Sequence, residues 1–134
     1  MTLSFKGVGA ITLFVEDLPR ARAFYRDVFG LKLLFEDGCS AAFGFGDTII
    51  NLLAVAEARD LVAPGTVAGP GAGSRFQLTI WVEDADAVCA ELAARGVTLL
   101  NGPMDRDWGK RTAAFADPAG TIWEIAQDIP AKTA

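Results

Sequence analysis

The sequence predicts an α+β fold built from two tandem β-α-β-β-β modules, whose curved mixed sheets surround a cleft. Short segments with alternating apolar residues, typical of strands, are interrupted twice by segments with helical spacing. The second half also repeats the first, because residues 11–17 (ITLFVED) align with residues 78–84 (LTIWVED). Such self-similarity indicates units that stack and bury their apolar faces together.

The first module is predicted over residues 1–56. Asp17 is a suitable N-cap for its helix, and Gly30 suits the left-handed conformation that ends a helix. Glu-Asp-Gly and Gly-Asp turns separate the apolar runs that follow, which indicates hairpin-connected strands. The expected elements are a strand at 8–15, a helix from Leu18 to Gly30, and strands at 31–35, 40–45 and 48–55.

A connector is predicted over residues 57–74, where Pro and Gly accumulate and few apolar side chains recur at any period. One helical turn is expected within it, at residues 57–61. The second module then spans residues 75–134. Its expected elements are a strand around Leu78, a helix capped by Asp84 and ended by Gly96, a strand at Leu99-Leu100 that matches Leu33-Leu34, and a final hairpin.

Composition argues against several classes of protein. The length of 134 residues is typical of one domain, and the net charge of −5 without a basic cluster argues against nucleic acid as a partner. No apolar run is long enough for a membrane span and no signal-peptide pattern is present, so a cytoplasmic protein is expected. Cys39 and Cys89 are expected to be reduced thiols. The sequence contains no histidine, so the commonest metal ligand and the usual near-neutral base are missing.

Residues 115–125 are the most informative stretch. They indicate the end of one strand, an Asp-Pro-Ala-Gly turn at 117–120, and a second strand in which Glu124 stands among apolar residues. The proline presets φ in the turn and the glycine accepts a left-handed conformation, so a hairpin is expected. Strand alternation puts Glu124 on one face with Ile122 and Ala126.

Together with Trp-Gly-Lys-Arg at 108–111, this stretch resembles the C-terminal signature of the vicinal oxygen chelate superfamily, which includes glyoxalases, bleomycin-resistance proteins and extradiol dioxygenases. The resemblance covers nearly the whole chain, since two β-α-β-β-β modules are also the fold of that superfamily. It implies that helices cover the convex face of each sheet and that the concave faces enclose a cavity. It also implies four cavity-facing ligand positions, which correspond here to Ala10, Asn51, Gln77 and Glu124.

These four residues depart from the metal-binding pattern of the superfamily's enzymes. Ala10 has no ligand atom, Asn51 and Gln77 offer neutral carbonyl oxygens, and only Glu124 is anionic. Such a set suits Ca²⁺ or Mg²⁺ weakly, and it lacks the imidazole, thiolate or additional carboxylate ligands typical of Zn²⁺, Fe²⁺, Ni²⁺ or Mn²⁺ sites. No metal and no other cofactor is therefore expected.

The expected ligand-binding residues are Asn51, Gln77, Trp81, Trp108, Arg111, Glu124, Phe14, Phe43 and Phe45. Glu124 is either a surface charge on an edge strand or a partly desolvated carboxylate that orients a ligand or transfers a proton. Asn51 and Gln77 either contact the ligand or make ordinary cross-strand hydrogen bonds. Trp108 either packs over a neighbouring element or stacks on a planar ligand, and Arg111 either pairs with an anionic ligand group or is solvated. The three phenylalanines make the cavity or the core aromatic.

Three hypotheses about function follow. The preferred one is a metal-free homodimer that resembles the bleomycin-resistance branch and binds a small planar or amphipathic, antibiotic-like molecule. The second is a metal-dependent lyase, isomerase or dioxygenase of the same superfamily, and the third is a cofactor-free enzyme with Glu124 as its base. In each case the cleft forms either within one chain or across the dimer.

Overall fold

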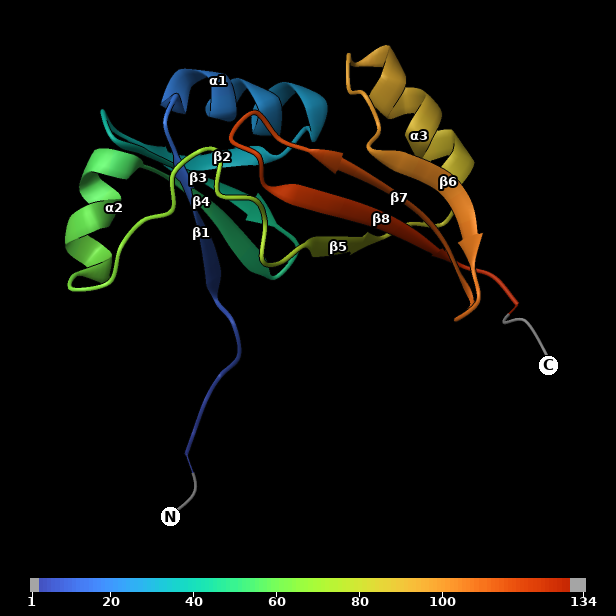
Figure 1. Ribbon diagram of the computed structural model, residues 1–134, viewed down its shortest axis with the longest axis horizontal. Coiled ribbons are helices and arrows are strands. Elements are labelled where there is room, and N and C mark those ends of the chain that lie inside the picture. The colour runs from blue at the N-terminus through green and yellow to red at the C-terminus, as the bar shows by residue number, and fades with distance from the viewer. Residues whose placement is uncertain (1–2, 131–134) are drawn as a thin grey trace. The chain divides into compact units, whose positions relative to one another are not determined.

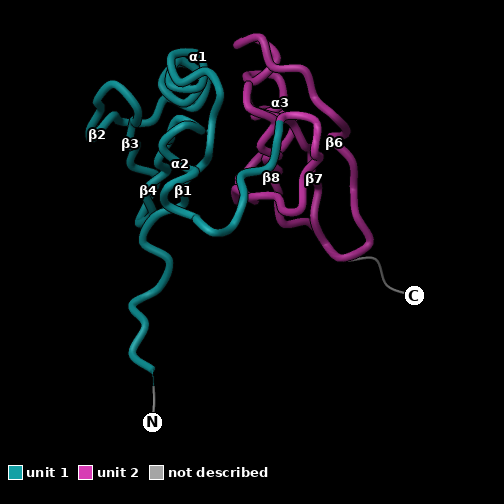
Figure 2. Tube along the Cα trace, turned by 60° about the vertical axis from the view of Figure 1, so that its left-hand side comes forward, with its two compact units in different colours: residues 1–69 teal, residues 70–134 magenta. Residues whose placement is uncertain are grey.

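The computed structural model describes residues 3–130 and divides into two compact units, residues 1–69 and 70–134 (Figure 2). Each unit contains one four-stranded mixed sheet with the same topology: the first strand pairs in parallel with the last, and the other pairs are antiparallel. The predicted α+β class and the two β-α-β-β-β modules are therefore confirmed (Figure 1). The boundary between the units falls within the predicted connector.

Unit 1 has the strand order β1-β4-β3-β2. Its helix begins where predicted, since the Asp17 side chain accepts the N–H of Arg20, and Gly30 follows it with a φ of 68°. The helix is α-helical at first and continues as a π-helix, and the connector contains a longer helix than the single turn expected. The elements are β1 (Ala10–Val15), α1 (Leu18–Ala23), η1 (Phe24–Val28), β2 (Lys32–Glu36), β3 (Ser40–Phe45), β4 (Thr48–Ala54) and α2 (Val55–Val62).

The core of unit 1 lies between its sheet and the α1 and η1 helices. Tyr25 of η1 and Phe43 of β3 are fully buried, with ring centroids 6.2 Å apart. Phe45 packs edge-on against Phe29 at 6.1 Å. Burial of such rings supplies much of the apolar stabilisation of a unit this small.

Unit 2 has the strand order β5-β8-β7-β6. The Asp84 side chain accepts the N–H of Ala87 and caps its helix, as predicted, and Gly96 follows the helix with a φ of 86°. The strand expected at Leu99-Leu100 begins instead at Asn101. The elements are β5 (Leu78–Trp81), α3 (Ala85–Ala94), β6 (Asn101–Arg106), β7 (Lys110–Ala116) and β8 (Ile122–Asp128).

One of the two edge strands of each sheet, β2 in unit 1 and β6 in unit 2, is irregular. The pairing of β2 with β3 shifts register between Leu33 and Phe35, and the pairing of β6 with β7 shifts between Asn101 and Met104. Such bulges change which side chains face which side of the sheet. In unit 2, the shift determines on which face of the sheet the side chains at the end of β6 lie.

The turn between β7 and β8 forms as predicted. Asp117 is buried, and its Oδ1 accepts the N–H groups of Ala119 and Thr121 at 2.9 and 2.8 Å. Gly120 adopts a φ of 93°, which favours glycine over any residue with a Cβ. The two cysteines are free thiols, as expected. None of the helices within residues 3–130 combines the length and apolar character needed to cross a membrane.

Candidate functional site

The sheet of unit 2 has two different faces. Trp123 and Ile125 are buried on the side that α3 covers, and Glu124 lies on the opposite side. We call this opposite side the Glu124 face. The pairing registers place on it Thr79, Trp81, Asn101, Met104, Arg106, Lys110, Thr112, Ala114, Glu124 and Ala126.

Glu124 is held by a neighbouring side chain on this face. Thr79 of β5 pairs in register with Glu124 of β8, and the Thr79 hydroxyl donates a hydrogen bond to Oε1 of Glu124 at 3.0 Å. A carboxylate has two oxygens with several acceptor positions, so most of its acceptor capacity remains. Glu124 is partly exposed, and Thr79 is exposed.

Glu124 has an alanine across from it and one beyond it along β8, with Ile122 before it on the same face. Ala114 lies directly across from it on β7, and Ala126 follows it on the same face of β8. Trp81 stands beside Ala126 in the register and is 71% exposed. The Lys110 ammonium lies 4.7 Å from the centroid of the Trp81 ring and also pairs with Asp128. On the Glu124 face the carboxylate therefore lies beside two small, buried alanines, and an exposed indole ring lies next to them.

A shallow hollow of about 200 Å³ lies where β5 and β8 end, and residues from both faces of the sheet line it. Its lining combines the Trp81 indole with two carboxylates and the Gln127 amide. It is formed by Trp81, Val82, Glu83, Ala126, Gln127 and Asp128.

Unit 1 carries a matching pair at the repeated position. Thr12 of β1 pairs in register with Asn51 of β4, and Asn51 Nδ2 donates to Thr12 Oγ1 at 3.4 Å. This pair has the same strand positions as Thr79 and Glu124. The same face carries Phe14, which pairs with Leu53.

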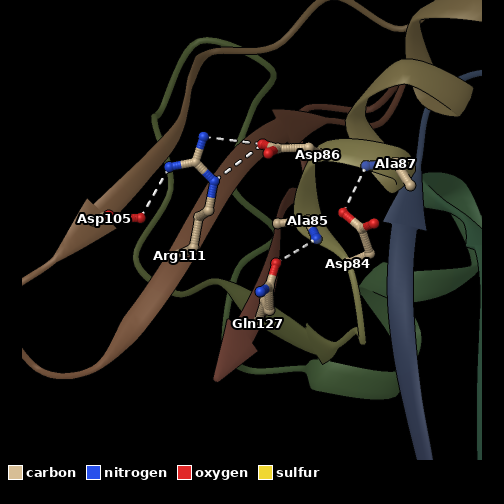
Figure 3. Close-up of polar contacts among 7 residues, drawn as sticks. All are labelled: Asp84, Ala85, Asp86, Ala87, Asp105, Arg111 and Gln127. Carbon is tan, nitrogen blue, oxygen red and sulfur yellow. Dashed lines mark hydrogen bonds and ion pairs between the residues drawn. The ribbon is translucent and has the colours of Figure 1, made fainter. Parts of the chain in front are cut away.

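Phe43, Phe45 and Arg111 lie on the covered faces of the sheets. The two phenylalanines belong to the core beneath α1 and η1, so they are core aromatics and do not line the Asn51 side. Arg111 lies on the α3 side, where its guanidinium bonds to Asp86 of α3 and Asp105 of β6, both at 2.9 Å (Figure 3). Hydrogen bonds to Asp105 and Asp86 raise the pKa of Arg111.

Arg111 belongs to a set of contacts that holds the first turn of α3. On the same side, the Oε1 of Gln127 accepts the N–H of Ala85 at 2.8 Å (Figure 3). Strands β7 and β8 thus each fix one residue of that turn. These contacts position the helix, and they pair the Arg111 guanidinium with two carboxylates.

Gln77 and Trp108 lie outside the regular strands. Gln77 is exposed and directly precedes β5. Trp108 lies in the turn between β6 and β7, is 67% exposed, and has the Arg106 guanidinium carbon 5.8 Å from its ring centroid. The Trp108 ring therefore stands beside a cation.

Sequence reasoning missed Arg106, which lies on the Glu124 face. Its Nε donates to the Thr112 hydroxyl at 3.0 Å, and its Nη2 lies 3.4 Å from Oδ1 of Asn101.

The tight turn fixes the pairing of β7 with β8, and this pairing places Arg111 opposite Gln127, on the side of Trp123. The pairing of β7 with β8 could therefore be predicted from the turn, whereas the bulge that places Arg106 on the Glu124 face could not.

The four positions that correspond to metal ligands do not offer a suitable ligand set. Ala10 has no donor atom, the Asn51 amide nitrogen is bonded to Thr12, and one Glu124 oxygen accepts from Thr79. Within the described residues no group of three or more Cys, Asp or Glu side chains is arranged to hold a metal ion. The chemistry of these donors does not fit a transition metal.

Comparison with known proteins agrees with this architecture. The family model described as Glyoxalase/Bleomycin resistance protein/Dioxygenase superfamily matches residues 7–125. The uncharacterized protein YraH of Bacillus subtilis (strain 168) is 35% identical over 119 residues, which are 86% of this chain and 93% of YraH.

Solved structures with the same fold include two whose names refer to this group. A glyoxalase/bleomycin resistance protein/dioxygenase from Nocardioides superposes with a TM-score of 0.85 at 22% identity, covering 99% of this chain and 93% of that one. A lactoylglutathione lyase from Agrobacterium tumefaciens gives 0.73 at 23% identity, covering 92% and 95%. Because the family model spans most of the sequence and YraH is clearly related, this chain belongs to the glyoxalase/bleomycin resistance protein/dioxygenase superfamily.

Proposed function

We propose that this protein binds a small planar or amphipathic molecule without a metal ion, in the manner of the bleomycin-resistance branch, and that the Glu124 face is its binding surface. The observation that carries the proposal is the hydrogen-bonded pair of Thr79 and Glu124, which lies beside Ala114 and Ala126 and near the exposed Trp81. Binding sites for small molecules typically combine apolar surface with a few well-placed polar groups.

Each part of this face has a role in the proposal. Ala114 and Ala126 beside Glu124 carry only methyl groups and are 7% and 2% exposed, so Glu124 is the polar group that a ligand would meet here. Thr79 fixes one carboxylate oxygen and leaves the other to accept from a ligand N–H or O–H. Trp81 offers an exposed aromatic surface beside Ala126.

The donor atoms disfavour a metal-dependent lyase, isomerase or dioxygenase. Ala10 occupies one of the four corresponding positions, and two others are neutral amides. The similar structure named lactoylglutathione lyase is 23% identical, which supports the fold alone. A cofactor-free reaction with Glu124 as base is the competing outcome, and it would appear as conversion of a bound compound that Glu124→Gln abolishes.

The proposal is tested by titrating planar aromatic compounds against the fluorescence of Trp81. Glu124→Gln should weaken compounds with a cationic or hydrogen-donating group by about tenfold or more, since a hydrogen bond to a charged group contributes about 1.5–3 kcal/mol. The matched control is Glu91→Gln, a glutamate on α3 that pairs with Arg95. Trp81→Phe identifies the emission that responds. Equal affinities of wild type and Glu124→Gln for every compound would refute this binding surface.

We propose further that the protein acts as a cytoplasmic homodimer. Both sheets expose large apolar side chains, including Leu34 and Phe35 at 51% and 57% and Trp81 at 71%. Exposed apolar patches are typical of protein interfaces and ligand sites. Sedimentation velocity at micromolar concentration should show a dimer, and a monomer throughout that range would contradict the proposed assembly.

A further inference from the structure

Two arginines near the turn between β6 and β7 lie on opposite faces of the unit 2 sheet. Arg111 pairs in register with Asp105 on the α3 side, whereas Arg106 pairs with Lys110 on the Glu124 face. The bond from Arg106 Nε to Thr112 Oγ1 confirms this placement, since Thr112 pairs with Ala126. A guanidinium group therefore shares a face with the carboxylate of the proposed binding surface.

The charge of Arg106 is not balanced by a carboxylate within residues 3–130. None of the ion pairs in this part of the chain includes it, and its contacts are the Thr112 hydroxyl, the Asn101 side-chain oxygen and the Trp108 ring. A guanidinium has five N–H donors, of which two are used here, so three remain for another acceptor. Lys110 on the same face already pairs with Asp128.

The Arg106 side chain reaches the row of residues across the sheet that includes Glu124. Asn101, Ala114 and Glu124 lie side by side on β6, β7 and β8, and Nη2 of Arg106 reaches Asn101. Neighbouring strands are about 4.8 Å apart, so the backbones of β6 and β8 are separated by about 10 Å. The methyl group of Ala114 lies between the two charged groups. This span suits one planar ring with a polar group at each end.

We propose that Arg106 recognises an anionic group of the ligand, and that the ligand of this face carries a carboxylate at one end of a planar ring and an ammonium or other hydrogen-bond donor at the other. Guanidinium pairs with carboxylate through two parallel hydrogen bonds, which gives both strength and orientation. Glu124, positioned by Thr79, accepts the donor at the other end. The inference rests on the proposed function and adds the chemical class of the ligand.

The test uses three matched probes: para-aminomethylbenzoate, which carries both groups, para-aminomethylbenzamide, which lacks the anion, and para-methylbenzoate, which lacks the ammonium. Their affinities are measured by calorimetric titration of the wild-type protein, of Arg106→Gln and of Glu124→Gln. Arg95→Gln is the control for loss of one positive charge in unit 2, because Arg95 pairs with Glu91 on α3. Arg106→Lys tests whether charge alone is enough, and near-native circular dichroism is required of each variant.

The wild type should bind the compound with both groups about tenfold more tightly than either single-group compound. Arg106→Gln should abolish the preference for the acid over the amide and leave the affinity for the amide unchanged, while Arg106→Lys should retain part of the preference. Equal wild-type affinity for the acid and the amide overturns the inference, whichever variants fold. If the acid and the amide bind equally well and Glu124→Gln weakens the binding of each, the proposed function survives. If none of the three binds, both proposals fail.

Discussion

Replacement of Asp117 by alanine should destabilise unit 2 strongly, because this side chain organises the turn that positions β8. Asp117 is 5% exposed, and a single oxygen, Oδ1, accepts the N–H groups of Ala119 and Thr121. A hydrogen bond to a charged group contributes about 1.5–3 kcal/mol, and the loss of two from one side chain is expected to cost about 3 kcal/mol in total. The substitution also leaves two amide groups of a tight turn without this partner.

Asparagine at the same position is the matched variant. Asn keeps an Oδ1 acceptor of nearly the same shape, so both backbone donors retain a partner, and only the charge is lost. The expected cost of Asp117→Asn is about 1 kcal/mol in total, because hydrogen bonds to a neutral acceptor contribute less than hydrogen bonds to a charged one. The difference between the two variants therefore measures the acceptor together with the side-chain volume that alanine removes, separately from the charge.

The assay is urea unfolding followed by tryptophan emission. All three tryptophans, at 81, 108 and 123, belong to unit 2, and Trp123 is buried at 3% exposure, so the signal reports on the unit that contains the turn. The free energy of unfolding follows from linear extrapolation, with an unchanged slope expected for all three proteins. Equal destabilisation by alanine and asparagine, or none by either, would show that the acceptor does not hold the turn.

Three further predictions concern other parts of the chain. Gly102→Ala should cost more than about 1 kcal/mol of stability in urea unfolding, because φ is 83° and an added Cβ would lie 2.3 Å from the carbonyl oxygen of Thr112. Gly71→Ala, also in unit 2, is the control, because nothing lies within 4 Å of its added Cβ. The pKa of the Cys39 thiol is raised, chiefly by its hydrogen bond to Asp37, so Asp37→Asn should shift its alkylation profile to lower pH in mass-spectrometric labelling. EDTA should leave the thermal midpoint of unfolding unchanged, and elemental analysis of the purified protein should find Zn, Ni, Fe and Mn well below one per chain. A stoichiometric metal that EDTA removes together with stability would refute this prediction.

The architecture was predictable from sequence because several local signals agree. Asp17 and Asp84 cap the two helices as expected, and Gly30 and Gly96 follow them in the left-handed conformation. Asn51 and Glu124 hold equivalent positions in the two modules, since Asn51 pairs with Thr12 and Glu124 pairs with Thr79 in the same register. The π-helical turn and the full length of α2 were not predicted, because no short-range pattern distinguishes them.

The composition of the candidate site was only partly predictable. Glu124 and Trp81 were assigned to one face by alternation along single strands, and that face is the one opposite α3. Arg111 was expected either to pair with an anionic ligand group or to be solvated, and the face on which it lies depends on a cross-strand register. Arg106 depends on the register shift in β6, which is a property of pairing and leaves no mark in the spacing of apolar residues.

The bulges in β2 and β6 also bear on aggregation. An exposed strand with regular pairing groups is a template for a strand from another molecule. Here both outer strands are interrupted, β2 begins and ends with Lys32 and Glu36, and β6 contains Pro103, which has no N–H to donate. Addition of a strand at β2 or β6 is therefore disfavoured, so each sheet is protected against intermolecular β-aggregation at one of its two edges.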